Sequence, residues 1–446
     1  MKLYGTMKVN DKGHLEIGGC DTVELAQDYG TPLYVLDEEH FRQNCKNFYH
    51  AFTQQYGAEV IYAGKSLLTL AVCRMIDEEG LSLDVVSGGE LYTAIKANFP
   101  MNRVYFHGNN KTAEEIQMAL EHKVARIIVD SIYELELLNK IAGELRAKVK
   151  ILLRLTPGVE AHTHEYIKTG HIDSKFGLVV ENGQAMEGVK RALELENIEL
   201  RGFHCHIGSQ IFELESYAHA AAVMMEFISE VQKETGFKAS QLDLGGGLGI
   251  YYYHGDKPQS IKEYADIVMN TVKKQAEKFN LPMPKVMVEP GRSIAGPAGI
   301  TLYRVGSVKD IPGVRKYVAV DGSMGDNPRP ALYRAKYEAY TANRMNEKPA
   351  EIVSVAGRCC ESGDMLNWDL PLPRVQPGDI LAVAATGAYT YSMSSNYNRL
   401  PRPAMVLVNN GRVDLIIRRE TYADLLRNDL LPDRLRKKVL NIASAR

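Results

Sequence analysis

Short apolar runs recur between residues 60 and 289, and longer segments with apolar residues at three- and four-residue steps separate them. The runs predict strands at 60–63, 83–86, 104–106, 127–129, 151–155, 202–206, 242–244 and 286–288. The intervening segments predict helices at 67–79, 90–99, 113–122, 132–145, 184–195, 216–235 and 261–279. Such alternation indicates an α/β fold, with a parallel sheet and helices outside it.

Two architectures share this alternation: a closed (β/α)₈ TIM-type barrel and an open, doubly wound sheet. Most of the predicted strands end next to a residue that can do chemistry or bind a ligand: Lys65, Ser87, His107, Asp130, Thr156, Gly208, Ser209, Gly245 and Glu289. In a closed barrel the carboxyl ends of all strands share one face, so these residues would meet around a single mouth. We therefore favour the barrel and expect the functional site at that mouth.

The two ends of the chain have a different pattern. Residues 1–36 hold short apolar stretches, turn residues and one strand-like run at 32–36. From about residue 301 the pattern is rich in strands, at 315–321, 350–356, 379–384 and 404–408, and a helix is predicted only at 422–443. A second, β-rich domain formed from both termini is the simplest interpretation.

Composition limits the possible functions. The 446 residues are 45 % hydrophobic and carry a net charge of −2, so no basic surface for nucleic acid is expected. No segment is apolar enough to span a membrane, and residues 1–21 lack the apolar core of a signal peptide, which favours a cytoplasmic protein. The six cysteines show neither CxxC nor zinc-ligand spacing, so we expect free thiols and no metal site.

Lys65 follows the first predicted barrel strand. At a barrel mouth, a lysine whose pKa is lowered by its surroundings becomes an amine nucleophile that links to aldehydes. Alone, such a lysine is more simply explained as a solvated residue that opens a helix. The other strand ends add weight to the chemical interpretation.

Three further strand ends carry groups that suit a phosphate and a flat ring. Residues 243–249 form a glycine loop with free backbone N–H groups, although tight turns also need glycine. Glu289 and Arg292 flank a rigid turn, where a local ion pair is the plain alternative. His206 precedes Gly208 and Ser209, and could equally be a satisfied core histidine.

Together, an amine, a phosphate cradle, a flat ring and a carboxylate describe a pocket for pyridoxal 5′-phosphate. Lys65 would hold the aldehyde, the glycines the phosphate, His206 the ring face and Glu289 the ring nitrogen in its protonated form. A protonated ring is the stronger electron sink, which favours decarboxylation.

At these residues the chain resembles the fold-type III pyridoxal phosphate-dependent decarboxylases, and within them the branch that acts on diaminopimelate. The matching stretches run in order along nearly the whole chain: 62–65, 87–90, 107–111, 162–165, 173–177, 204–210, 243–249, 289–292, 329–333, 360–364, 387–389 and 395–398. The family usually continues its lysine motif with Ala-Asn, whereas here Gly64 precedes the lysine, and Ser66 and Leu67 follow it.

The resemblance implies a barrel at 37–300 and a β-domain from 1–36 and 301–446, paired as a head-to-tail homodimer with two shared active sites. It assigns catalysis to Lys65 and Cys360, with Cys360 arriving from the second subunit as proton donor. It assigns cofactor binding to Lys65, His206, Ser209, Gly246, Gly247, Glu289, Gly291, Arg292 and Tyr389, and substrate binding to Arg292, Arg329, Tyr333, Glu361 and Tyr389. A buried thiol can also be inert packing, and this stays an alternative for Cys360.

The implied reaction is decarboxylation of meso-2,6-diaminopimelate to L-lysine, the last step of lysine biosynthesis. The end of this substrate that does not react carries a carboxylate, which suits Arg292 and Arg329, and an ammonium, which suits Glu361. Decarboxylases of ornithine or arginine usually place Asp after the cysteine, so they and a decarboxylase of carboxylated polyamines are the minor alternatives. Without the resemblance, a surface arginine and a capping acid would explain Arg329 and Glu361 equally well.

Two other classes remain as rivals. Alanine racemase shares the barrel but pairs the pyridine nitrogen with arginine, and Glu289 argues against it. A catalytically inactive, decarboxylase-like regulator would bind a protein partner instead of a substrate. Such regulators lose cofactor residues, whereas Lys65, Glu289 and Cys360 are all present here.

Overall fold

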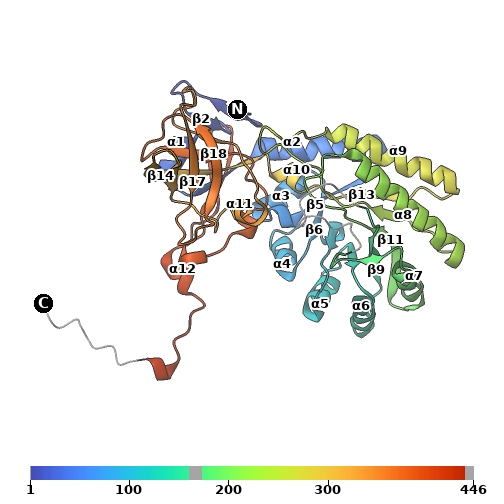
Figure 1. Ribbon diagram of the computed structural model, residues 1–446. Coiled ribbons are helices and arrows are strands. Elements are labelled where there is room, and N and C mark those ends of the chain that lie inside the picture. The colour runs from blue at the N-terminus through green and yellow to red at the C-terminus, as the bar shows by residue number, and fades with distance from the viewer. Residues whose placement is uncertain (1, 160–172, 437–446) are drawn as a thin grey trace.

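The computed structural model describes residues 2–159 and 173–436 of the 446-residue chain. A ring of helices around parallel strands forms one part of the molecule, and a β-rich part stands beside it (Figure 1). The matching stretch 162–165 lies outside the described residues.

Eight parallel strands form a closed barrel. They are β5 (Glu59–Ala63), β6 (Ser82–Val85), β7 (Val104–Phe106), β8 (Arg126–Val129), β9 (Val149–Thr156), β11 (Ile198–His204), β12 (Gln241–Asp243) and β13 (Lys285–Val288). Strand β13 pairs with β5, and β8 pairs with β9, so no edge is left open. The predicted barrel is confirmed, and the open doubly wound sheet is wrong.

Alternation along the strands divides the barrel into an inner and an outer layer. Inward-facing apolar side chains pack as one small cluster: Ile61, Tyr105, Ile128, Leu152 and Met287. Their neighbours in sequence, such as Val60 and Tyr62, belong instead to the large core between the strands and the helices. The barrel is therefore filled, and only its mouth is open to a ligand.

The helices outside the barrel follow the predicted order. They are α3 (Leu70–Glu78), α4 (Gly88–Lys96), α5 (Ala113–Glu121), α6 (Ile132–Glu144), α7 (Gln184–Glu194), α8 (Leu214–Thr235) and α9 (Ile261–Phe279). Each buries an apolar face; in α9, Tyr264, Val268 and Val272 face the core at four-residue steps. Side-chain caps begin most of them, with capping boxes at Thr112 and Ser260.

The second sheet unites the two ends of the chain. It contains β4 (Leu33–Asp37), β14 (Gly299–Ile311), β15 (Arg315–Val320), β16 (Ala339–Thr341), β17 (Glu351–Ala356), β18 (Met365–Leu372), β19 (Ile380–Val383), β20 (Ala404–Asn409) and β21 (Arg412–Ile417). Strand β4 lies between β14 and β20, which confirms a β-rich part built from both termini. The exact domain boundaries at residues 37 and 300 stay a prediction.

Several small elements complete the chain. Strands β1 (Lys8–Val9), β2 (Leu15–Ile17) and β3 (Cys20–Asp21) form a separate sheet, and β10 (Leu178–Val179) adds to β9. Helices α1 (Thr22–Asp28) and α2 (Glu38–Phe48) are additional to the prediction. Helix α2 buries Phe41, Cys45 and Phe48 at helical spacing behind an Asp37 cap, a pattern that the sequence does contain.

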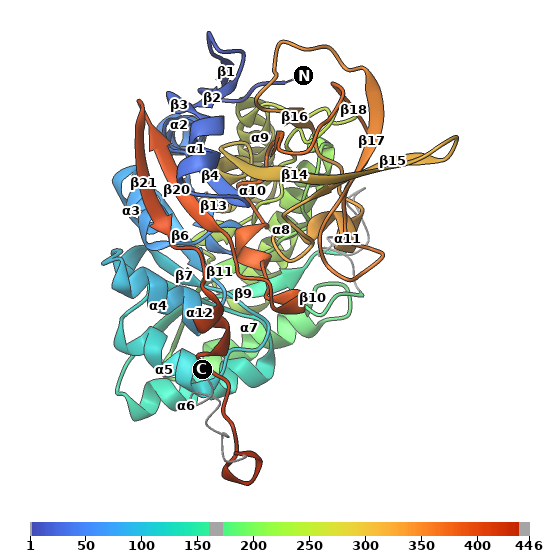
Figure 2. The ribbon, with the colours of Figure 1, turned by 90° about the vertical axis from the view of Figure 1, so that its left-hand side faces the viewer.

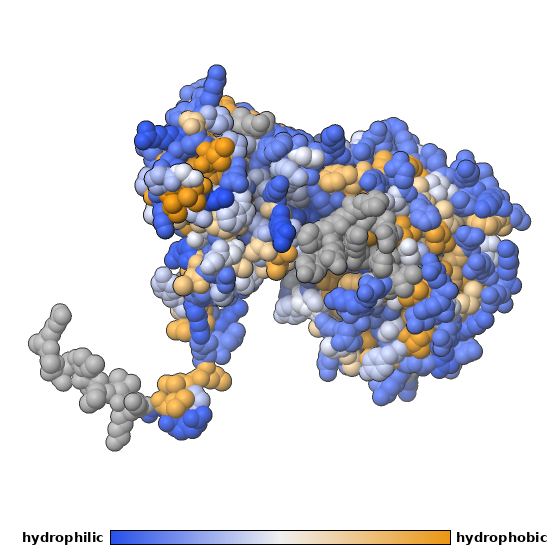
Figure 3. Space-filling model, in the orientation of Figure 1, coloured by the Kyte–Doolittle hydropathy of each residue, from blue (hydrophilic) through white to orange (hydrophobic). Residues whose placement is uncertain are grey.

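The predicted helix at 422–443 is wrong in extent. Helix α12 spans only Tyr422–Leu426, and a 3₁₀ turn follows at Asp433–Leu435; residues 437–443 lie outside the described part. Residues 422–436 form an arm in which Leu430 and Leu431 are 91 % and 57 % exposed. Little apolar contact therefore offsets the cost of helix formation. The arm extends away from the rest of the chain (Figure 2). Apolar residues are visible along it (Figure 3).

Among the described residues, no helix has the length and apolar character needed to cross a membrane.

Candidate active site

A cavity of about 460 Å³ opens at the carboxyl ends of the barrel strands. Its walls come from the barrel and from the β-rich part: Lys65, Val86, His107, Gly108, Asn109, Arg154, Phe176, His204, His206, Ser209, Glu289, Arg292, Arg329, Tyr333, Tyr389 and Met393. Eight of these residues are ones to which the sequence assigns a role. The tertiary structure therefore brings together side chains that lie more than 300 positions apart.

Lys65 lies in a 3₁₀ turn, Gly64–Ser66, directly after β5. Its ammonium is enclosed by acidic groups, and this changes the expected electrostatics. Burial alone would lower the pKa of Lys65, but attraction by Asp84, Tyr389 and Glu289 outweighs burial and raises it. The expectation of a lowered pKa is thus wrong, because the acidic groups beside the amine stabilise its charged form.

The unusual neighbours of Lys65 have structural roles. Ser66 Oγ is buried and donates to the carbonyl of Ala63 at 2.8 Å, while the Ser66 carbonyl accepts from the backbone N–H of Tyr389 at 2.8 Å. A Cβ at position 64 would lie 2.6 Å from the carbonyl oxygen of Asp84, so glycine permits this close approach. Gly64 thus lets the lysine turn approach β6, the Ser66 hydroxyl closes the turn, and the backbone of Ser66 ties it to the loop that carries Tyr389.

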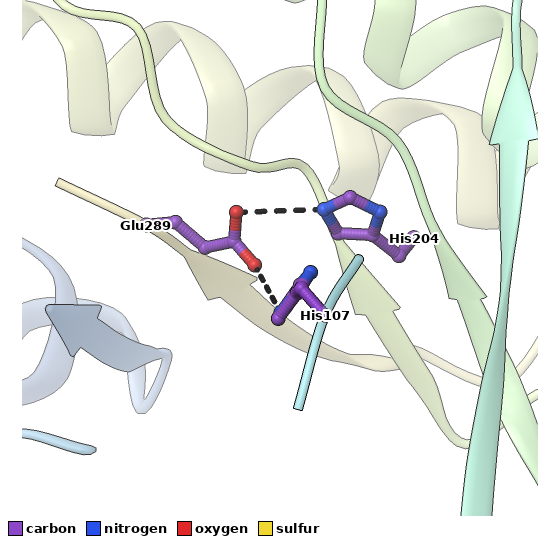
Figure 4. A group of neighbouring side chains, drawn as sticks. All are labelled: His107, His204 and Glu289. Carbon is purple, nitrogen blue, oxygen red and sulfur yellow. Dashed lines mark hydrogen bonds and ion pairs between the residues drawn. The ribbon is translucent and has the colours of Figure 1, made fainter. Parts of the chain in front are cut away.

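Glu289 follows β13, and its carboxylate faces two neighbouring histidines (Figure 4). His204 Nε2 is 3.4 Å from Glu289 Oε2, and His107 Nε2 is 3.0 Å from Glu289 Oε1. Burial would raise the pKa of Glu289, but His107 and His204 outweigh it and hold the pKa well below its usual range. The carboxylate therefore stays ionised.

Two other buried acids near Glu289 behave in the opposite way. Burial, together with the charge of Glu289, raises the pKa of Asp243 well above its usual range and also raises that of Asp84, although His107 partly opposes the shift at Asp84. Like charges close together disfavour simultaneous ionisation. Glu289 is accordingly the acid of this group that keeps its negative charge.

His206 lies in the loop after β11, because that strand ends at His204, two residues earlier than predicted. The backbone N–H of Gly246 donates to His206 Nδ1 at 3.2 Å, which orients the ring. Burial, followed by repulsion from Lys65, lowers the pKa of His206 well below its usual value. The imidazole is therefore a neutral flat ring with Nδ1 as acceptor.

Gly246, Gly247 and Gly291 are not among the described residues that line the cavity. An added Cβ at Gly246 would lie 2.0 Å from the carbonyl oxygen of Glu289, and one at Gly247 would lie 2.3 Å from that of Gly208. The glycine loop thus allows close packing of three strand ends. Its role in binding phosphate stays a prediction.

Three arginines line the cavity, and Arg154 lies 3.7 Å from the carboxylate of Asp130, whereas Arg292 and Arg329 come from other parts of the chain. Arg292 begins α10 (Arg292–Ala295) and donates to Ser209 Oγ at 2.7 Å and to Tyr252 Oη at 2.7 Å. Arg329 begins α11 (Arg329–Tyr333) and lies over the ring of Tyr252 at 4.6 Å. Neither has a carboxylate within 4.0 Å among residues 2–159 and 173–436, and Arg329 Nε there lacks a hydrogen-bond partner. Two guanidiniums without an acid partner suit an anionic ligand.

Cys360 and Glu361 do not line this cavity. Both are exposed in the turn between β17 and β18, where the Cys360 N–H donates to Asn398 Oδ1 at 2.7 Å and Glu361 Oε1 accepts from the Gly363 N–H at 3.2 Å. An exposed thiol does not fit the alternative of inert core packing. Within one chain, the described part of the site thus lacks both of these residues.

The sequence assigned no role to four buried ionisable residues of this region: Asp84, His107, Arg154 and His204. A signal was present in each case, because Asp84 and Arg154 are charged residues inside otherwise apolar strands. His204 is the last residue of β11, two positions before His206, and His107 directly follows β7. Side chains alternate between the inside and the outside of a barrel strand. Only by following this alternation residue by residue can the sequence show that such a charged residue points inward.

His204 gives the stability of the protein a pH dependence. Burial lowers the pKa of His204 to about 3, against about 6.5 in an unfolded chain. Between these values only the unfolded chain binds the proton, so acid favours unfolding. When the pH falls from about 6.5 to about 4.5, we expect the free energy of unfolding of the wild type to decrease by roughly 2–3 kcal/mol more than that of His204→Gln.

Urea unfolding of both proteins without cofactor, at one fixed protein concentration, measures this difference. The parallel variant His254→Gln, which changes a histidine outside the cavity, should follow the wild-type pH dependence. Equal pH dependence in the wild type and His204→Gln would show that His204 is not held neutral.

These groups suit pyridoxal 5′-phosphate. Lys65 offers a partly buried amine, His206 a neutral ring, and Glu289 an ionised carboxylate in the same cavity. Glu289 Oε1 lies 3.0 Å from His107 Nε2 but accepts no hydrogen bond from the described residues. One acceptor position of the carboxylate thus remains for the N–H of a protonated pyridine ring.

Known proteins resemble this chain over nearly its whole length. Residues 38–296 match the family described as pyridoxal-dependent decarboxylase, pyridoxal binding domain. The diaminopimelate decarboxylase of Bacillus subtilis (strain 168) is 52 % identical over 431 residues, which cover 96 % of this chain and 98 % of that relative. The crystal structure of diaminopimelate decarboxylase from M. jannaschii in co-complex with L-lysine has a TM-score of 0.91 and 42 % identity, and the match covers 97 % of this chain and 100 % of that one.

Proposed function

The chain belongs to the pyridoxal-dependent decarboxylase family, and from this membership we propose that it converts meso-2,6-diaminopimelate to L-lysine and carbon dioxide, the last step of lysine biosynthesis. The cofactor is pyridoxal 5′-phosphate. One observation carries the proposal furthest. A single cavity holds a partly buried amine, an ionised carboxylate and two guanidiniums without a carboxylate partner among the described residues.

The side chains of the cavity have distinct roles in this proposal. Lys65 holds the cofactor through Nζ and releases it when the substrate amine takes its place. Glu289 accepts a hydrogen bond from the ring nitrogen, and His206 packs on the face of the ring. When bound, pyridoxal 5′-phosphate supplies the electron sink that accepts the electron pair left behind by carbon dioxide. Ser209, Gly246, Gly247, Gly291, Arg292 and Tyr389 hold the remainder of the cofactor.

Substrate choice follows from charge. Arg329 and Arg292, with Tyr333 beside them in the cavity, bind the carboxylate at the end of the substrate that does not react. Glu361 of a second copy binds the ammonium at that end, and the Cys360 thiol of that copy returns a proton to the carbon that has lost its carboxylate. A substrate that lacks either charge leaves a buried group unpaired, which costs several kcal/mol.

The proposal therefore includes a homodimer with shared sites. Its support is the position of Cys360 and Glu361, which are exposed and stand outside the cavity of their own chain. All six cysteines are free thiols, which supports work in a reducing, cytoplasmic compartment.

Carbon dioxide release, measured side by side, tests the activity. The assay compares meso-diaminopimelate with lysine, which lacks the distal carboxylate, and with 2-aminopimelate, which lacks the distal ammonium; ornithine and arginine test the minor alternatives. We expect kcat/KM for diaminopimelate to exceed that of each other compound by about 10³ or more. Equal turnover of ornithine would refute the substrate assignment, and no turnover of any compound by cofactor-loaded protein would favour the inactive regulator.

Arg329→Met tests the anion site. Its guanidinium is buried and donates to Tyr337 Oη at 2.5 Å, so loss of the charge leaves the substrate carboxylate unpaired. We expect kcat/KM for diaminopimelate to fall roughly 100-fold, equivalent to about 3 kcal/mol, mainly through KM. Steady-state kinetics measure the effect, and the exposed Arg374→Met is the matched control. Unchanged KM in Arg329→Met would place the substrate carboxylate elsewhere.

A further inference from the structure

Three barrel strands converge on the carboxylate of Glu289. His107 follows β7, His204 ends β11 and Glu289 follows β13, and all three side chains are buried. The two imidazoles approach different oxygens of the carboxylate, His107 at 3.0 Å and His204 at 3.4 Å, and their rings meet edge to face with centroids 4.9 Å apart (Figure 4). Both oxygens of Glu289 are thus approached by imidazoles that have no assigned role.

Two other buried acids lie close to Glu289 and compete with it for the negative charge. Asp84 on β6 and Asp243 on β12 are fully buried beside Glu289, and Asp84 has no hydrogen-bond partner on either oxygen among the described residues. Arg154 of β9 and Lys65 supply positive charge to the same group of acids. Without local donors, any of the three acids could carry the negative charge, because the acids compete for it.

His204 can act only as a neutral donor. It is 1 % exposed, and burial lowers its pKa to about 3. A neutral imidazole has one N–H, and the contact of Nε2 with an ionised carboxylate places the proton there. Nδ1 has no partner in the described part of the chain. His107 Nε2 stands 3.8 Å from Asp84 Oδ1 as well as 3.0 Å from Glu289, so it bridges the two acids.

We propose that His107 and His204 are positioning residues that clamp the Glu289 carboxylate in one orientation and confine the negative charge to it, so that this pair sets the protonation of the cofactor's ring nitrogen. The inference rests on the proposed function, since it takes Glu289 as the partner of the ring nitrogen. The hydrogen bond at Oε2 and the close contact at Oε1 fix the plane of the carboxylate, so the acceptor position that remains on Oε1 points in one direction only. Loss of either grip would let the charge move to Asp84 or Asp243.

The test uses holoenzyme reconstituted with pyridoxal 5′-phosphate that carries ¹⁵N in its ring. The ¹⁵N chemical shift reports directly whether the ring nitrogen is protonated, and a merely structural role would not move it. In the wild type we expect a protonated nitrogen from about pH 6 to about pH 9. Glu289→Gln provides the unprotonated reference.

Variants of the two histidines separate positioning from packing. In His204→Leu and His107→Leu the ring nitrogen should lose its proton within that pH range, with kcat reduced about 10- to 100-fold and KM changed less than about threefold. His204→Gln and His107→Gln retain an N–H donor and should recover most of the wild-type shift and kcat. Wild-type shifts and turnover in both Leu variants would overturn the clamp.

Two measurements on the wild type need no variant to fold. A ring nitrogen that deprotonates below about pH 8 would overturn the proposal. The same three residues have ligand atoms within 4.8 Å of one another, a spacing that also suits a metal ion. Elemental analysis that finds one bound metal per active holoenzyme would make the histidines ligands and would equally overturn it.

The failure of the underlying function has a different signature. Cofactor bound covalently to Lys65 should give an absorbance that borohydride changes. If the wild-type protein shows no such absorbance, the proposed cofactor site is wrong. If that absorbance is normal and only the histidine variants are without effect, the clamp alone fails.

Discussion

Lys65→Ala is expected to abolish decarboxylation, with kcat reduced about 10⁴-fold or more, and to remove the absorbance of covalently held cofactor. The amine lines the cavity, and no other lysine is among the described residues that line it, so none of those residues can replace it. The side chain lines the cavity instead of filling the core, so the fold should persist. Absorbance spectra, carbon dioxide release and circular dichroism measure the three outcomes.

The exposed Lys150→Ala is a matched control, because it also removes one positive charge near the barrel. It should keep wild-type turnover and spectrum. Turnover of Lys65→Ala within about tenfold of the wild type, without an added amine, would contradict the role of Lys65.

Lys65→Ala and Cys360→Ala chains, each inactive alone, should regain activity when they are unfolded and refolded together. Random pairing makes half of the dimers mixed, and each mixed dimer has one intact site of two, so recovery should approach roughly a quarter of wild-type activity. The physical basis is that Lys65 lies in the cavity whereas Cys360 is exposed outside it. Activity is measured together with native mass spectrometry, which counts mixed dimers.

A second mixture gives a matched control. Lys65 and Glu289 line the same cavity of one chain, so mixed dimers of Lys65→Ala and Glu289→Gln contain no intact site. That mixture should recover no more than the activity of Glu289→Gln alone. If the first mixture also recovers nothing although mixed dimers form, the shared site is wrong.

Much of the fold could be predicted from local patterns. Strand β7 (Val104–Phe106) and helix α9 (Ile261–Phe279) have the predicted bounds, because their apolar periodicity decides which face is buried. Helix α2 was not predicted, although its apolar residues have helical spacing. It begins directly after β4, a strand of the other sheet, with no loop between them to mark its start. The arm after residue 421 shows the converse: apolar residues without a surface to cover do not form a long helix.

The sequence by itself determined that the chain alternates strand and helix and that chemically active residues follow the strands. Because parallel strands in a barrel end on one face, this was enough to expect that Lys65, His206 and Glu289 meet. Only the tertiary structure decided that β4 lies between β14 and β20, because strand pairing between distant segments depends on what else is buried. It alone also decided that Glu289, and not Asp84 or Asp243, keeps the negative charge, because the pKa of a buried acid depends on neighbours from other strands.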